Sequence, residues 1–169
     1  MVKIKFGLSL LILFFSWSGF CAQVLLDVTL SPVGSFEIRS ESIGGKLTYM
    51  DSEKRYLTKR LFVRSGELTS GIELRDQHIH KFFKSDDFPY IELKNVEAKN
   101  GRGTGELHVA GQKQKIEFTY SIKDDLLLAE FDLNLDDLKF EVPSFMGIRP
   151  KKEIGVKVYY ELSRVLRLK

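Results

Sequence analysis

Residues 115–122 read KIEFTYSI, and apolar and polar side chains take turns along the whole stretch. On an extended chain this order places Ile116, Phe118 and Tyr120 on one face and the polar side chains on the other. Alternation with a period of two predicts a β-strand with one buried face and one solvated face. Residues 154–162, which read IGVKVYYEL, repeat the pattern.

Weaker copies of this pattern run through most of the chain, and turn residues separate them. Asn100-Gly101 lies between two copies and is a strong signal for a two-residue hairpin turn. We expect strands at residues 24–39 (bent at Pro32), 43–50, 57–65, 90–97, 103–110, 115–122, 126–133 and 154–162. Short connections join most of them, and a sheet of eight with one apolar face curls into a barrel, which removes its edges. The sequence therefore predicts an all-β fold, an eight-stranded antiparallel up-and-down barrel.

One segment has helical spacing instead of alternation. The side chains of Ile79, Phe82 and Phe83 recur at intervals of three and four residues, and Ser70 is placed to cap the start of a helix. This predicted helix lies inside a long connection, residues 66–89.

A second long connection covers residues 134–153. Loops alternate between the two ends of an up-and-down sheet, so connections after the third and seventh strands fall at the same end, which we call the mouth. Phe145 and Met146 belong to the second connection and are apolar where an exposed loop is expected. Two interpretations stay open: these side chains flank the entry path of a ligand, or the loop is tucked onto the core.

The N-terminus has the order of a secretory signal peptide. Two lysines precede an apolar run that is short for a membrane span, and small residues end the segment near Cys21. We therefore expect residues 1–22 to be a signal peptide and residues 23–169 to form a single exported domain. A lipidated Cys21 and an uncleaved anchor are the alternatives, and the exact cleavage site stays open.

The composition limits the function further. The chain has 169 residues with 43% hydrophobic residues, and 26 Lys+Arg oppose 23 Asp+Glu. Removal of residues 1–22 would take away two lysines and no acid, lowering the net charge from +3 to +1. So small a charge argues against nucleic-acid binding, and the basic C-terminal tail supports at most peripheral contact with a membrane. The oligomeric state does not follow from the sequence.

The inward face of the predicted barrel is almost entirely apolar. An eight-stranded barrel is either filled by its own side chains or wide enough for one small ligand, and both outcomes stay open here. A ligand of such a lumen would be a long apolar chain, which gains about 0.8 kcal/mol for each methylene group that it buries. The residues that we expect to contact it in the lumen or at the mouth are Phe36, Ile38, Leu47, Tyr49, Leu61, Val63, Ile79, Phe82, Ile91, Leu93, Leu107, Val109, Ile116, Phe118, Tyr120, Phe131, Leu133, Phe145, Met146, Val156, Val158 and Tyr160.

Few side chains form a pattern that suggests chemistry. His78 and His80 are two residues apart, so on a helix they point to different sides and cannot hold one metal ion together. Arg75, Asp76 and His78 admit an acid–base interpretation, with Ser70 as a distant nucleophile, but no nucleophile elbow surrounds that serine. We predict no catalytic residue, no metal and no cofactor. A secreted enzyme that uses Asp76 and His78 at the mouth remains an alternative, as does an interaction module built on a solid barrel.

Three stretches of the chain form a recognisable set: TSGIELRDQH at residues 69–78, DFPYI at 87–91 and GELHVAG at 105–111. Together these motifs resemble the YceI-like family of exported polyisoprenoid-binding proteins, and the Arg-Asp-x-His block is the most specific of them. The opening strand differs from the family pattern, with Leu30-Ser31-Pro32 in place of an Asp-Pro-x-His-Ser block. The resemblance implies a lipocalin-like barrel with a helix across it and a long isoprenoid or fatty chain in the lumen. It also implies a non-catalytic carrier or sequestering protein of the periplasm.

Overall fold

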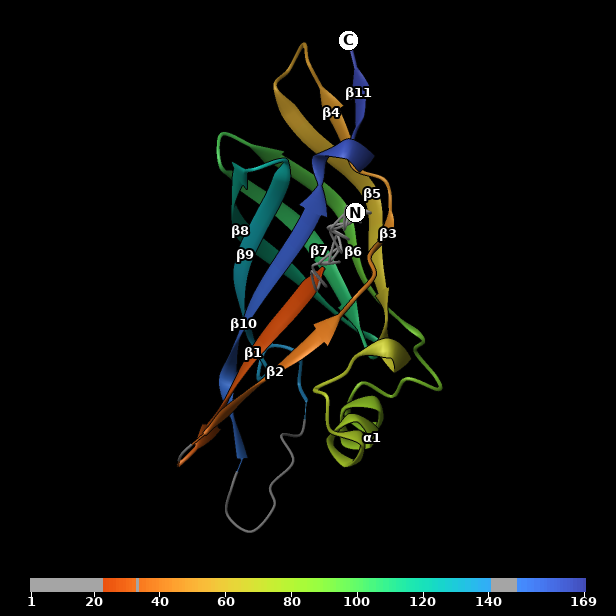
Figure 1. Ribbon diagram of the computed structural model, residues 1–169, viewed down its shortest axis with the longest axis vertical. Coiled ribbons are helices and arrows are strands. Elements are labelled where there is room, and N and C mark those ends of the chain that lie inside the picture. Colours follow the sequence, from red (N-terminus) through yellow and green to blue (C-terminus); the bar gives the residue numbers. More distant parts are fainter. Residues whose placement is uncertain (1–22, 33, 141–148) are drawn as a thin grey trace, which may run out of the picture.

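The structure is a computed structural model, and it describes residues 23–32, 34–140 and 149–169. Within these ranges the chain forms eleven strands, one α-helix and two short 3₁₀ helices (Figure 1). The strands are β1 (Val24–Ser31), β2 (Ser35–Ser40), β3 (Gly44–Gly45), β4 (Thr48–Met50), β5 (Arg55–Arg64), β6 (Tyr90–Lys99), β7 (Arg102–Val109), β8 (Gln112–Lys123), β9 (Leu126–Asn134), β10 (Arg149–Glu161) and β11 (Leu166–Leu168). The helices are η1 (Ser65–Glu67), α1 (Glu73–Phe82) and η2 (Leu162–Arg164). The predicted signal peptide lies outside the described residues.

The strands form one curled sheet in the order β11-β4-β5-β6-β7-β8-β9-β10-β1-β2, with β3 also paired to β5. From β4 to β10 each strand pairs antiparallel with its neighbour, as the hairpin signals predict. The alternation is confirmed for residues 116–119, because Ile116 and Phe118 are buried whereas Glu117 and Thr119 are exposed, but it fails at the end of β8, where Ile122 is 49% exposed. The all-β prediction with one helix is therefore correct.

The predicted number of eight strands is wrong. Residues 24–39 form the hairpin of β1 and β2 rather than one bent strand, because the chain reverses between Ser31 and Ser35. Residues 43–50 split into β3 and β4, and Gly45 at the end of β3 has a φ of 101°, which lies outside the extended region. No strand is predicted after residue 162, yet the basic tail adds β11 in parallel to β4.

The sheet curls without closing into a ring of hydrogen-bonded strands. Among the described residues, no ladder joins β2 at one edge to β4 and β11 at the other. Side chains close the gap instead, along what we call the seam, where the C-terminal end of β10 and η2 contact residues 43–47. At the seam the Tyr160 hydroxyl donates to the Gly45 carbonyl at 3.2 Å and accepts from the Leu47 amide at 3.4 Å. The Arg164 guanidinium donates to the carbonyl of Ile43 at 2.8 Å.

Removal of the Tyr160 hydroxyl should weaken the seam. Tyr160 is only 1% exposed, so a phenylalanine there would leave the partly buried Gly45 carbonyl and the buried Leu47 amide without this partner. We expect Tyr160→Phe to lower the free energy of unfolding by about 1–2 kcal/mol in urea denaturation. Tyr159→Phe is the matched control, because its half-buried side chain lies on the opposite face of the same strand. An equal loss in both variants would contradict the role of the seam.

Strand β6 keeps its apolar side chains inward by means of a bulge. Its register against β7 shifts between Lys94 and Glu97, and Asn95 there has a φ of 51°. Leu93 lines the interior before the bulge and Val96 after it, so the inward positions change from odd to even numbers. A bulge of this kind also increases the local twist, which helps the sheet to curl.

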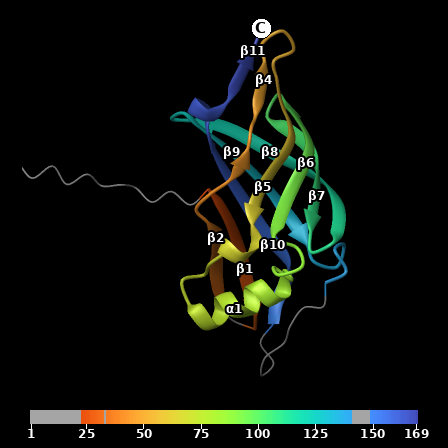
Figure 2. The same ribbon diagram turned by 90° about the vertical axis from the view of Figure 1, so that its right-hand side faces the viewer.

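The helix lies across one end of the curled sheet, and β4 and β11 extend from the other end (Figures 1 and 2). The second long connection reaches the same end as the helix, because the rings of Phe82 and Phe140 pack edge to face with centroids 5.0 Å apart. The prediction that both long connections meet at one mouth is therefore confirmed for the described residues. The predicted cap is wrong: Ile72 occupies the N-cap position, and Ser70 instead bonds the side chain of Asp76.

Candidate functional site

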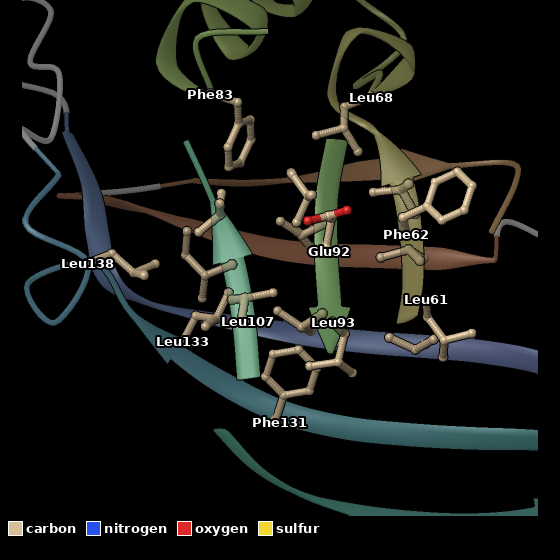
Figure 3. A pocket seen from close by; sticks show the side chains of 18 of the residues that line it. Leu61, Phe62, Leu68, Phe83, Glu92, Leu93, Leu107, Phe131, Leu133 and Leu138 are labelled. Atoms are coloured by element: carbon tan, nitrogen blue, oxygen red, sulfur yellow. The ribbon is translucent and has the colours of Figure 1, made fainter. Parts of the chain in front are cut away.

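The curled sheet encloses a central cavity of about 90 Å³. Figure 3 shows Phe83 and Leu68 reaching it from the helical end, while Leu93, Leu107 and Phe131 reach it from the strands. The remaining lining residues are Val24, Leu26, Ile43, Leu61, Phe62, Val63, Ile91, Glu92, Val109, Leu133, Leu135, Leu138, Phe140, Ile154, Val156 and Val158. An apolar cavity of this kind stays dry and accepts apolar guests.

Among the described residues that line this cavity, one is charged, Glu92. Its carboxylate forms ion pairs with Arg60 and with Lys94, the second at 2.8 Å, and both partners are partly exposed. Partial burial raises the pKa of Glu92, but the hydrogen bonds from Lys94 and Arg60 outweigh this effect and hold the pKa below its ordinary value. The carboxylate is thus ionised and paired with basic groups, and the cavity takes its character from aliphatic and aromatic side chains.

A second cavity, of about 40 Å³, lies toward the seam. Tyr56, Tyr120 and Tyr160 line it, and the rings of Tyr56 and Tyr120 pack edge to face with centroids 5.7 Å apart. Burial raises the pKa of Tyr56, so its phenol stays neutral at physiological pH. Among the described residues, no ionised side chain lines this tyrosine cavity.

A third cavity, of about 120 Å³, lies between α1 and the β1–β2 hairpin. Its floor is apolar, with Phe36 and Ile38 from β2 facing Ile79 and Phe82 from the helix. Two basic residues of α1 complete the lining: Arg75, which is half-buried, and His78, which is exposed. We call this space the helix cavity.

The three cavities follow one another along the lumen. The central cavity shares Leu61, Leu93, Phe131 and Val158 with the tyrosine cavity. With the helix cavity it shares Leu26, Phe83, Leu135 and Ile154. Single layers of side chains therefore separate neighbouring cavities, and the interior is an interrupted apolar channel that runs from the helix to the tyrosines.

Most residues predicted to face the lumen line one of these cavities. The exceptions are Tyr49, which stacks on Tyr56 with ring centroids 4.7 Å apart, and Ile116, which is buried beside the channel. Phe145 and Met146 lie outside the described residues. Contact of these side chains with a lipid stays a prediction.

Sequence reasoning missed the residues that close the mouth. Leu135 and Leu138 are 4% and 2% exposed, and they line the central cavity together with Phe140. They follow β9 in the segment LDDLKF, where the Asp136-Asp137 pair suggests a solvated loop. The signal that could have found them is the spacing of Leu135 and Leu138, three residues apart as on one face of a helical turn.

The acid–base pair considered from the sequence does not assemble. The Asp76 carboxylate accepts hydrogen bonds from the Ser70 amide at 2.6 Å, the Ser70 hydroxyl at 2.7 Å and the Thr69 hydroxyl at 2.6 Å. Partial burial raises the pKa of Asp76, but these hydrogen bonds hold it below its ordinary value. His78 lines the helix cavity, which Asp76 does not, and His80 bonds the Leu68 carbonyl. The Asp76 carboxylate thus fixes the loop before α1, and we call this set of hydrogen bonds the aspartate clasp.

The described residues contain neither a candidate metal cluster nor a helix that could cross a membrane. No group of three His, Cys, Asp or Glu side chains in them is arranged to hold a metal ion. Helix α1, the α-helix of the described part of the chain, falls short of the length and apolar character that a membrane span needs.

Comparison with known proteins places the chain beside one family. The profile of the YceI-like domain matches residues 23–162. Among curated protein sequences, none matches the chain.

Solved structures share the fold at low sequence identity. Burkholderia cenocepacia BcnA superposes with a TM-score of 0.61 at 8% identity, covering 80% of this chain and 94% of that one. The Campylobacter jejuni YCEI protein gives 0.57 at 16% identity, covering 76% and 85%. A polyisoprenoid binding domain from Saccharophagus degradans, implicated in plant cell wall breakdown, gives 0.56 at 12% identity, covering 83% and 95%.

Proposed function

Because the chain belongs to the YceI-like domain family, we propose that it is an exported, non-catalytic protein that binds a long isoprenoid or fatty chain inside the curled sheet. The observation that carries this proposal is the line of three apolar cavities from α1 to the tyrosines. A flexible hydrocarbon chain is the ligand that fits a narrow, dry and elongated space. The polyisoprenoid-binding domain of Saccharophagus degradans, which has the same fold, supports the same class of ligand.

The bound chain would join the three cavities. Leu61, Leu93 and Phe131 line both the central and the tyrosine cavities, so rotamer changes of these side chains would open the passage between them. Each methylene group buried there contributes about 0.8 kcal/mol before ordering costs are subtracted. In this proposal the seam closes the wall around the ligand, and the residues predicted to face the lumen form the lipid site.

The proposed compartment is the periplasm, with residues 1–22 as the signal peptide that directs export. Their order of basic, apolar and small residues supports this part of the proposal. As a carrier or a sequestering protein, the molecule would keep an insoluble chain away from water.

A substitution that fills the channel should abolish binding. Leu133 on β9 lines the central cavity and is 9% exposed, so the indole of Leu133→Trp would occupy the space meant for the ligand. We expect the dissociation constant for farnesol, measured by isothermal titration calorimetry, to rise at least about tenfold, the equivalent of about two lost methylene contacts.

The matched control is Asp132→Trp, which places the same bulk on the exposed face of the same strand. Its affinity for farnesol should stay within about twofold of that of the unaltered protein, because the substituted side chain does not face the channel. A twofold change corresponds to a difference of about 0.4 kcal/mol in binding free energy. Circular dichroism melting curves check that both variants fold, because overpacking costs about 1–3 kcal/mol. If the unaltered protein binds no farnesol or longer prenyl chain, and organic extraction of protein from its host yields no amphiphile, the proposal is wrong.

A further inference from the structure

The two ends of the channel differ in charge. At the helix cavity, Arg75 stacks on the aromatic ring of Phe36, with its Cζ atom 4.3 Å from the ring centroid. Arg75 is half-buried and His78 beside it is exposed, so this cavity reaches the molecular surface at two basic side chains. The tyrosine cavity at the other end has phenol groups in its lining, and among the described residues no Arg, Lys, His, Asp or Glu side chain lines it. Arg164 stacks on the ring of Tyr160 but does not line this cavity, and its guanidinium already donates to the carbonyl of Ile43.

Stacking orients the guanidinium group without using its hydrogen-bond donors. The cation attracts the face of the Phe36 ring, whereas the N–H groups of arginine point outward in its own plane. These donors form a rigid fork that matches two oxygen atoms of a phosphate or carboxylate, and the positive charge persists at any physiological pH. The imidazole of His78 lines the same cavity and supplies a further donor.

The acidic residues near Arg75 leave room for an anion. The carboxylate of Asp76 is occupied by the hydroxyl groups of Thr69 and Ser70 and by the Ser70 amide, away from the helix cavity. Among the residues that the structure describes, no carboxylate oxygen lies within 4.0 Å of an Arg75 side-chain nitrogen.

We propose that Arg75 and His78 form a binding site for the oxyanion head group of the lipid, and that the apolar chain runs from there toward the tyrosines. This inference rests on the proposed function, because it specifies the class of ligand as an anionic amphiphile and gives its direction. An uncharged amphiphile would fill the same channel but gain nothing from the two basic side chains.

The test compares farnesyl phosphate with farnesol, which carry the same chain and differ in the head group. Isothermal titration calorimetry on the purified protein should give farnesyl phosphate an affinity about tenfold higher than that of farnesol, as expected for charge-assisted hydrogen bonds. In Arg75→Gln this advantage should disappear, so that the variant binds farnesyl phosphate and farnesol with equal affinity. Arg75→Lys, which keeps the charge and loses the fork, should retain part of it.

Lys81→Gln is the matched control, since Lys81 is an exposed base on the same helix that does not line the helix cavity. It should leave both affinities unchanged.

Equal affinities of the unaltered protein for the two probes would overturn the head-group site but leave the proposed function intact, whereas no binding of either probe would overturn both. A parallel loss for both probes in Arg75→Gln would mean that Arg75 acts by packing on Phe36. Inorganic phosphate alone should bind far more weakly than farnesyl phosphate, and equal binding would assign the site to free phosphate instead.

Discussion

Replacement of Gly45 by alanine should lower the free energy of unfolding by about 3 kcal/mol or more, because the residue lies at the seam in a conformation that alanine adopts poorly. Its φ is 101°, a region that residues with a Cβ atom rarely occupy. A Cβ atom built there would lie 2.2 Å from the backbone carbonyl oxygen of Arg60, which belongs to β5 and cannot rotate away. The pairing of β3 with β5 would have to shift, and with it the carbonyl of Gly45 that accepts the Tyr160 hydroxyl.

Gly66→Ala is the control for this substitution. Gly66 lies in η1, where a Cβ atom would meet nothing within 4 Å, so its effect should stay within about 0.5 kcal/mol. Urea denaturation followed by circular dichroism measures both variants. Similar stabilities of Gly45→Ala and Gly66→Ala would refute the close approach of β3 to β5.

Loss of the aspartate clasp is the second large effect that we expect. In Asp76→Ala the Thr69 hydroxyl, the Ser70 hydroxyl and the Ser70 amide all lose a charged acceptor at 2.6–2.7 Å. Hydrogen bonds to charged groups are worth more than neutral ones, and the partial exposure of Asp76 reduces their contribution, so the expected loss is about 2–3 kcal/mol. Thr69 also pairs with Arg39 on β2 through its backbone, so the clasp links α1 to the edge of the sheet.

The clasp should also depend on pH in a defined direction. The pKa of Asp76 in the folded protein lies below its ordinary value of 3.8, so the ionised carboxylate stabilises the fold above that pH. This stabilisation is lost as the pH falls through the folded-state pKa, where the carboxyl group becomes protonated in both states.

The difference in stability between the unaltered protein and Asp76→Asn should therefore be constant above about pH 5 and shrink below it. Urea denaturation at a series of pH values from neutral to acid measures this difference. Asp87→Asn, at an exposed residue after the same helix, controls for general effects of charge. A difference that grows on acidification would contradict the role of the clasp.

The parts of the fold that the sequence predicts well are those where one physical requirement dominates. Residues 115–122 and 154–161 alternate because one face packs against the core over the middle of each strand, and both lie in long antiparallel strands. The segment 43–50 also contains apolar residues at alternate positions, yet it breaks at Gly45 because the backbone there must leave the extended region. Strand β11 was missed because its three residues are exposed and depend on pairing with β4, a contact with a segment more than a hundred residues away.

The same distinction applies to the candidate site. Side chains on the strands were placed in the lumen by periodicity alone, and most of them line its cavities. Leu138 and Phe83 could not be placed in this way, because they lie in connections whose direction depends on tertiary packing. The role of Asp76 was equally hidden: its neighbours Arg75 and His78 suggest chemistry, whereas the residues that it binds, Thr69 and Ser70, precede the helix.

Because the sheet does not close into a ring, β2 and β11 are edge strands, each with one side that no neighbouring strand pairs. Exposed edge strands can pair with other chains and cause aggregation unless they are short or charged. Here β2 exposes the charged side chains of Glu37 and Arg39, and β11 is three residues long and exposes Arg167. Short length and charge both disfavour the addition of a strand from another molecule to the sheet. The resistance of this protein to aggregation thus depends on the composition of its two edge strands, whereas a closed barrel would have no edge strands to protect.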